Sequence, residues 1–426
     1  MQYPGRKFVK RIMIDHSSRK TTLSYSWIIV IAATCIYTVV GGQSICIGVF
    51  IKPIAAEFEW PRAVVTTGYS IYTLTISLLG LFSGFLVDRY SPRPIVTIGG
   101  LALGLGLCLC AATQSLWHFY ICFGLLRGLG FICIYIPLTV TIANWLTDKK
   151  GLALGILLAG AGVGGLLLTP LIQFLITQYS WRTALVITGT LVISTTLSLV
   201  LFLRKKPPEK SLRPLEGAAR PPASKAAMSG LKCRDDFTAQ EAIKSSQFWI
   251  FSIATALIWL GILMAVIHLV PHATDKGFLP ATAALALGIS AAFNAFGRVA
   301  IGAISDKIGT KPAIAFSLLL GSSMLFWLIF VTENWMLYLF AVSFGLAYGG
   351  FLPQQPSVIV ELFGRTSMGK IMGFNNLILA LGPAIGPVVG AAIFDRTGSY
   401  SLAFALGGSS IFTGFALIML LKLPQK

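Results

Sequence analysis

The 426-residue chain is 55% hydrophobic and only 11% charged, and its mean hydropathy is +0.80. A soluble domain carries about 25% charged residues because its surface faces water, so this composition excludes a soluble enzyme. The apolar residues occur in blocks of about 20 or more, the length that a helix needs to cross a hydrocarbon core of roughly 30 Å. Strands of a membrane barrel would alternate apolar and polar residues, so blocks such as Leu185–Leu203 predict helices.

The net charge of +18 is concentrated outside these apolar blocks. Basic residues precede the first block at 6–20 and gather again at 204–244 in the middle of the chain. The loops after even-numbered blocks also carry more Lys and Arg than the loops after odd-numbered blocks. The positive-inside rule therefore predicts that both termini are cytoplasmic, in an inner or plasma membrane, and no nucleic-acid partner is expected.

Twelve transmembrane helices are predicted in chain order, which makes the chain an all-α membrane protein. We place them at 25–50, 64–87, 94–113, 118–143, 151–175, 183–203, 247–270, 281–304, 312–331, 335–360, 369–393 and 400–421. The Pro-, Lys- and Arg-rich composition between the sixth and seventh helices cannot bury a core and predicts a linker. The expected organisation is a basic tail (1–24), a six-helix bundle (25–203), a cytoplasmic linker (204–246) and a second six-helix bundle (247–422).

The two predicted bundles repeat each other in sequence. The segment GFLVDR at 84–89 matches GAISDK at 302–307, and Gly151 and Gly155 match Gly369 and Gly373 at the same offset. Matches in register at equivalent places argue for an internal duplication. Two parallel six-helix halves joined by a linker, with a site between them, are typical of secondary transporters.

With these motifs the sequence resembles the major facilitator superfamily over nearly its whole length. GFLVDRYSPRP is similar to the loop signature of that superfamily, and GAISDKIGTKP is the second copy. The resemblance implies gating or structural roles for Asp88, Arg89, Arg93, Asp306 and Lys307. The first copy departs from the signature, because Ser91 replaces a glycine and Pro92 replaces an arginine.

Within the superfamily, several stretches resemble the monocarboxylate porter and oxalate–formate antiporter branch: GVFIKPIAAEFEWPRA, RGLGFICIYIPL, NWLTDKKGLALGILLAGAGVGG, HLVPHATDKGF and NAFGRVAIGAISD. Arg298 lies in the last of these, about eight residues from the cytoplasmic end of its helix at Asp306. A charge at that depth is costly and marks a functional site, and a guanidinium can hold a carboxylate through two hydrogen bonds. The resemblance assigns this arginine to the substrate carboxylate; a structural pairing with another helix is the alternative.

The resemblance also points to neighbours of this arginine. Asn294 lies one turn earlier, where proton-coupled porters often have an aspartate, so that proton route is missing. Tyr135, Phe344 and Tyr348 correspond to aromatic positions against the substrate, and Tyr37 is a further candidate. Packing in the helix bundle is the alternative for each of these rings.

Two other polar positions lie at membrane depth. For Arg127 we predict a structural or gating role within the first half, and His268 is a candidate protonation site. Pro271 disrupts the helical spacing of His268 and His272, and no acidic third ligand is evident, so no metal site is predicted. No cofactor or nucleotide motif is found either.

These features predict a transporter of a small monocarboxylate such as lactate or pyruvate, moved by alternating access with proton symport. The eleventh helix carries only Lys370 at its cytoplasmic start, whereas the oxalate branch is expected to place a lysine deep in that helix. An exchanger of oxalate, formate or dicarboxylates remains the alternative within transport, and a non-transporting membrane receptor the alternative outside it. The protein is expected to be monomeric in the lipid bilayer and not to be an enzyme.

Overall fold

The computed structural model describes residues 5–146, 150–204, 237–364 and 367–421, except for the side chains of 5–24, 81–88, 150–151 and 306. Within these ranges the secondary structure is entirely helical, as predicted. The first half contains α1 (Gly5–Ile45), α2 (Ile47–Phe58), α3 (Arg62–Arg89), α4 (Pro92–Cys110), α5 (Leu116–Phe119), a π-helical segment η1 (Tyr120–Leu126), α6 (Arg127–Trp145), α7 (Lys150–Gln178) and α8 (Trp181–Val200).

The second half is built in the same way. It contains α9 (Ala239–Lys244), α10 (Ser246–Asp275), α11 (Pro280–Ile308), α12 (Thr310–Ile329), α13 (Asn334–Phe351), α14 (Gln354–Phe363), α15 (Met368–Leu379), α16 (Leu381–Thr397) and α17 (Ser401–Leu420). Across the described residues, 12 helical segments are long and apolar enough to span a membrane, which confirms the predicted number. Three of the spans are interrupted helices: α5–η1–α6, α13–α14 and α15–α16.

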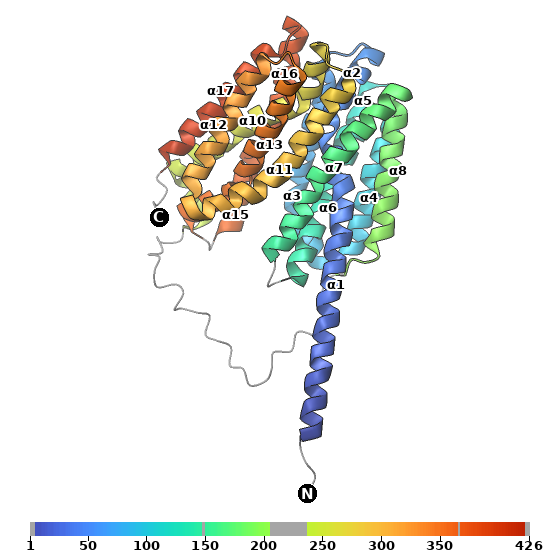
Figure 1. Cartoon of the computed structure of the whole chain (residues 1–426), viewed down its shortest axis with the longest axis vertical. Coiled ribbons are helices and arrows are strands. Elements are labelled where there is room, and N and C mark those ends of the chain that lie inside the picture. Colours follow the sequence, from blue (N-terminus) through green and yellow to red (C-terminus); the bar gives the residue numbers. More distant parts are fainter. Residues whose placement is uncertain (1–4, 147–149, 205–236, 365–366, 422–426) are drawn as a thin grey trace.

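The predicted tail and linker are described only in part. The helix α1 begins at Gly5 and projects far beyond the bundle, so most of the tail at 1–24 continues the first spanning helix (Figure 1). Residues 205–236 of the linker lie outside the described residues. The end of the linker is ordered: Thr238 and Glu241 cap α9 reciprocally, and the Phe237 amide donates to the Phe363 carbonyl.

The membrane-spanning part has two sides that are named here by the chain termini. The first span begins at Tyr25 and the last ends at Leu420 on the same side, which is called the terminal side. The loops between α2 and α3 and between α10 and α11 lie on the opposite side (Figure 1). The two halves meet mainly where α3 packs on α16 and α7 packs on α11.

Small residues allow these helices to approach closely, as expected for packing between helices in lipid. A Cβ atom added to Gly162 of α7 would lie 2.6 Å from the Ala291 carbonyl of α11. Within the first half, a Cβ atom added to Gly164 would collide with the Thr38 carbonyl of α1. The same helix α7 contains Gly155, around which no heavy atom of the described residues lies within 4 Å of an added Cβ.

This contrast gives a matched pair of substitutions. We expect Gly164→Ala to lower the thermal unfolding midpoint of the purified protein, because overpacking costs about 1–3 kcal/mol. We expect Gly155→Ala to leave the midpoint unchanged or raise it, because alanine favours a helix by about 0.5–1 kcal/mol over glycine. Thermal unfolding in detergent measures both, and equal midpoints for the two variants would contradict the close contact between α1 and α7.

Candidate functional site between the two halves

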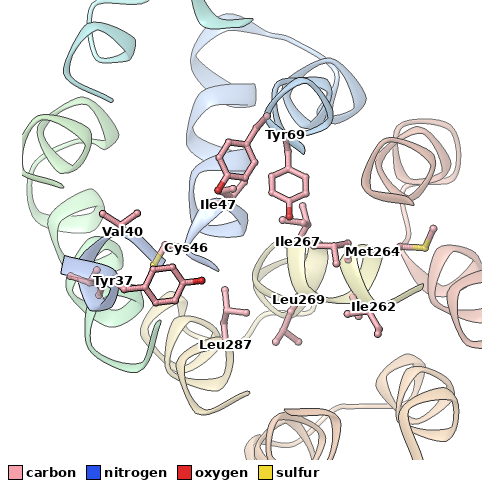
Figure 2. Close-up of a cluster of buried hydrophobic side chains, with 14 of the residues drawn as sticks. Tyr37, Val40, Cys46, Ile47, Tyr69, Ile262, Met264, Ile267, Leu269 and Leu287 are labelled. Carbon is pink, nitrogen blue, oxygen red and sulfur yellow. The ribbon is translucent and has the colours of Figure 1, made fainter. Parts of the chain in front are cut away.

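A cavity of about 340 Å³ lies between the two halves of the molecule. Its lining comes from α1, α3, α6 and α7 in the first half and from α10, α11, α13, α15 and α16 in the second half. Residues from both halves therefore face one space in the middle of the bundle. Figure 2 shows this meeting point, with Tyr37 and Tyr69 from the first half near Ile267 and Leu287 from the second.

Arg298 and Asn294 of α11, two of the predicted binding residues, both line this cavity. They lie one helical turn apart, so their side chains share a face of α11. The Arg298 Nε and Asn294 Nδ2 atoms are buried and have no hydrogen-bond partner among the described residues. No ion pair found in the described part of the chain includes Arg298. A cation and a buried amide donor are thus available to acceptors of a ligand.

The predicted aromatic residues divide into two groups. Tyr37 and Tyr348 line the cavity, and Tyr135 lies behind Tyr37 with its ring centroid 5.7 Å away. Phe344 does not line the cavity; it is 2% exposed and stacks on Phe340 at a centroid distance of 5.0 Å. Phe340 lies one turn before Phe344 on the same helix, so this contact is local to α13.

Other cavity residues were not anticipated from the sequence. Trp259 of α10 packs edge-on against Tyr348 with centroids 5.6 Å apart, and its Nε1 atom is buried without a partner in the described part of the chain. Tyr69, Tyr72 and Phe131 complete an aromatic surface from α3 and α6. The sequence could have pointed to these residues only because they are aromatic and lie in the middle of a span. Many other residues of the sequence share this property, so it does not single them out.

Arg127 lies outside this cavity and is 1% exposed. Its Nε donates to the Gln43 Oε1 atom at 3.1 Å, and its guanidinium lies 4.6 Å from the ring centroids of both Tyr72 and Phe123. These contacts join α6 to α1, α3 and η1 within the first half. The Arg127 Nη1 atom is buried without a hydrogen-bond partner in the described part of the chain, and the predicted structural or gating role of Arg127 stays a prediction. Tyr72 also lines the cavity, so this cluster adjoins the site.

A group of charged and polar residues on the opposite side connects the two halves. We name this group the interhalf ion cluster; it consists of Lys52, Arg62, Asp275, Asp395 and Tyr400. Arg62 holds Asp275 through two hydrogen bonds of 2.5 and 3.1 Å, and Lys52 lies 2.8 Å from the same carboxylate. Asp395 accepts a hydrogen bond from the backbone amide of Arg62 at 3.0 Å, at the N-terminus of α3. Lys52 and Arg62 belong to the first half and the other three to the second.

Arg62 of this cluster also contacts two aromatic rings of the second half. The Arg62 guanidinium also donates to the Tyr400 hydroxyl at 3.1 Å and lies 3.7 Å from the centroid of the Phe394 ring. Burial raises the pKa of the Tyr400 hydroxyl, so it stays protonated at physiological pH. The cluster therefore joins the two halves on the opposite side of the molecule.

Comparison with known proteins identifies the architecture. A profile described as Major Facilitator Superfamily matches residues 29–322 and 273–426. The chain belongs to the major facilitator superfamily. Two solved structures share its fold: the nucleoside transporter NupG (TM-score 0.71, 14% identity, 94% of this chain and 100% of that chain) and an inward-facing, unoccupied bacterial homologue of the human lysosomal transporter Spinster (TM-score 0.68, 19% identity, 93% and 95%).

The chain is also similar in sequence to proteins named monocarboxylate transporters. It is 30% identical to monocarboxylate transporter 11 of Mus musculus over 406 residues, covering 93% of this chain and 87% of that protein. It is 27% identical to monocarboxylate transporter 13 of Rattus norvegicus over 413 residues, covering 95% and 91%. This integral membrane protein is therefore a transporter of the superfamily rather than an enzyme, and the monocarboxylate branch inferred from the sequence is confirmed.

The superfamily loop signature is only partly described. The side chains of Asp88 and Asp306 lie outside the described residues, so their predicted gating role stays a prediction. Arg93 donates to the carbonyls of Leu203 at 2.7 Å and Leu201 at 2.5 Å, which fixes the start of α4 to the end of α8 within the first half. Arg89 is exposed beside the Tyr90 ring, and Lys307 is exposed.

His268 of α10 is fully buried where it contacts α16 and Tyr400. Its Nε2 atom lies 2.7 Å from the Pro387 carbonyl, its Nδ1 atom is unpaired in the described part of the chain, and its ring stacks on Tyr400 at 4.8 Å. His272 contacts a different carbonyl, that of Leu328, at 3.2 Å. His268 is thus adjacent to the interhalf ion cluster, and its predicted protonation stays a prediction.

Proposed function

We propose that this protein is a secondary transporter that carries a monocarboxylate anion across the membrane by alternating access. The observation that carries the proposal is the Arg298 guanidinium in the cavity between the two halves, where its Nε atom has no partner among the described residues. A guanidinium remains charged and can bind a carboxylate through two parallel hydrogen bonds. The similarity to proteins named monocarboxylate transporters supports the same class of cargo.

The charge of the cavity favours one carboxylate over two. Among the described residues that line it, Arg298 is the one with a formal charge. A dicarboxylate would bring a second negative charge into a low-dielectric space with no second cation to receive it, which is costly. Lys370 lies in the first turn of α15, outside the cavity lining. These features support a monocarboxylate over oxalate or another dicarboxylate.

The interhalf ion cluster supports an orientation of the cavity toward the terminal side, because it joins the halves on the opposite side. With both termini cytoplasmic, as the basic flanks of the spans predict, this arrangement is an inward-facing state in an inner or plasma membrane. Breaking the cluster and closing the terminal side would expose the cavity to the other compartment.

Proton symport is the coupling that we propose, because a co-transported proton cancels the charge of the anion. Asn294 cannot titrate, and none of the described residues that line the cavity is acidic. The proton must therefore be carried elsewhere, and His268 is a buried titratable group in contact with the interhalf ion cluster.

Imposed gradients in proteoliposomes test this coupling. We expect an inward proton gradient to stimulate uptake of radiolabelled L-lactate several-fold in vesicles that contain no internal anion substrate. The control is the same vesicle with the proton gradient collapsed by an ionophore. Uptake that requires an internal organic anion and ignores the proton gradient would contradict symport and favour the exchanger.

A further inference from the structure

The cavity is much longer than a three-carbon acid. Along α11 its lining runs from Arg298, at the end of the cavity toward the terminal side, to Leu287, at the end toward the opposite side. Eleven residues of helix correspond to roughly 16 Å. Three carbons joined by bonds of about 1.5 Å extend over only about 4–5 Å with their oxygens. A carboxylate bound at Arg298 would therefore leave most of the cavity unfilled if the cargo were lactate.

The polar atoms that lack partners are gathered at one end of the cavity. Arg298 Nε, Asn294 Nδ2 and Trp259 Nε1 are all buried hydrogen-bond donors without partners among the described residues. All three residues line the part of the cavity toward the terminal side. A buried donor left unpaired is unfavourable, so a ligand with more acceptors than one carboxylate would be favoured. An oxygen on the carbon next to the carboxylate supplies such an acceptor.

The other end of the cavity is apolar and aromatic. Toward the opposite side its lining includes Ile45, Tyr69, Ile267 and Leu287, which come from four different helices. Figure 2 shows Tyr69 beside Ile267, and Leu287 on the side of Tyr37. An apolar end with aromatic rings suits a flat hydrophobic group, which gains from edge or offset contacts with Tyr rings.

The charges exclude one class of aromatic acid. An α-amino acid would bring an ammonium group close to Arg298, and none of the described residues that line the cavity is acidic. A buried ammonium without a counter-charge is strongly disfavoured. The acid is therefore better matched with a hydroxyl or oxo oxygen at its second carbon than with an amine.

We propose that the cargo of this transporter is an aryl-substituted 2-hydroxy or 2-oxo monocarboxylate, with its carboxylate at Arg298 and its ring at the apolar end near Leu287. The proposal rests on the proposed function and specifies its substrate class. The carboxylate and the second-carbon oxygen accept hydrogen bonds from Arg298, Asn294 and Trp259. The aryl ring lies between Tyr69, Ile267 and Leu287.

Isothermal titration calorimetry on the purified full-length protein tests the proposal with four probes. These are 3-phenyllactate, 3-phenylpropanoate, which lacks the second-carbon oxygen, L-phenylalanine, which replaces it with an ammonium, and L-lactate, which lacks the ring. We expect 3-phenyllactate to bind at least about tenfold more tightly than L-lactate, because it buries a phenyl group. We expect 3-phenylpropanoate to bind several-fold more weakly than 3-phenyllactate, and L-phenylalanine to bind most weakly of the aromatic probes.

Two variants of residues that line the cavity test where the aryl ring of the cargo binds. Leu287→Phe fills the apolar end, so we expect it to weaken 3-phenyllactate binding about tenfold and L-lactate binding by a clearly smaller factor. Tyr69→Leu keeps a side chain of moderate size and removes one aromatic contact, so it provides a second test if Leu287→Phe does not fold. Unchanged binding of 3-phenyllactate in both variants would overturn this placement.

The outcomes separate this inference from the proposed function. If L-lactate binds as tightly as 3-phenyllactate and both affinities depend on Arg298, the aryl proposal is wrong and monocarboxylate transport stands. If no acid binds in a manner that depends on Arg298, the proposed function itself is contradicted, and the aryl proposal fails with it.

Discussion

Replacing Arg298 with Gln is expected to reduce carboxylate binding by about 100-fold or more. The substitution keeps hydrogen-bond donors and much of the side-chain length but removes the positive charge in the cavity. Truncating one partner of a buried, hydrogen-bonded charge pair costs about 2–5 kcal/mol or more, because the remaining charge is left unpaired. Titration of the purified variant with a monocarboxylate measures the loss. Arg298→Lys restores the charge without the bidentate geometry, so its binding should lie between wild type and Arg298→Gln.

Arg396→Gln is the matched control for this substitution. Arg396 is an exposed arginine near the end of α16 and is absent from the lining of the cavity. We expect Arg396→Gln to bind the acid like wild type. Unaltered binding in Arg298→Gln, or an equal loss in Arg298→Gln and Arg396→Gln, would show that Arg298 is not the carboxylate site.

Replacing Asp275 with Asn is expected to shift the conformational equilibrium about tenfold toward a state that is open on the opposite side. Asp275 is the carboxylate shared by Lys52 and Arg62, and its removal leaves two cations of the first half facing the second half without their anion. The side chains of Arg62 and Asp275 are only 14% and 24% exposed, so solvent screens this pair incompletely. A tenfold change in an equilibrium corresponds to about 1.4 kcal/mol, a moderate effect for a partly buried pair.

Spin labels at Glu59 and Arg396 can report this shift, since both positions are exposed and lie in different halves on the opposite side. In a background with the native cysteines replaced by serine, double electron–electron resonance should show a longer distance component in Asp275→Asn. Glu333→Gln removes an exposed acid from the same side and should keep the wild-type distance. A distribution in Asp275→Asn that matches wild type would show that the interhalf ion cluster does not hold the opposite side closed.

The spans and the deep arginine could be predicted from the sequence because both follow from the cost of polar groups in lipid. Long apolar blocks need no tertiary information, so the twelve helices are confirmed with shifts of a few residues at most of their ends. Arg298 was conspicuous for the opposite reason, as a charge far from either end of its span. Its position in the cavity agrees with that reasoning, and its role in binding remains a proposal.

Contacts between distant segments could not be predicted in this way. Arg62 and Asp275 are 213 residues apart, and each lies at the end of a different helix, so nothing in the sequence pairs them. Trp259 was one aromatic residue among many, and only the packing of the helices places it beside Tyr348. Phe344 is the converse case, because its family position suggested a ligand contact, whereas its ring is buried against Phe340 of the same helix and does not line the cavity.

The central claim is that the Arg298 cavity binds and moves a monocarboxylate. The most direct test is uptake of a radiolabelled monocarboxylate, with L-lactate and 3-phenyllactate in parallel, into proteoliposomes that contain wild type, Arg298→Gln or Arg396→Gln. We expect saturable uptake of at least one acid by wild type and Arg396→Gln, and uptake by Arg298→Gln no faster than by protein-free liposomes. Equal uptake by wild type and Arg298→Gln would contradict the claim.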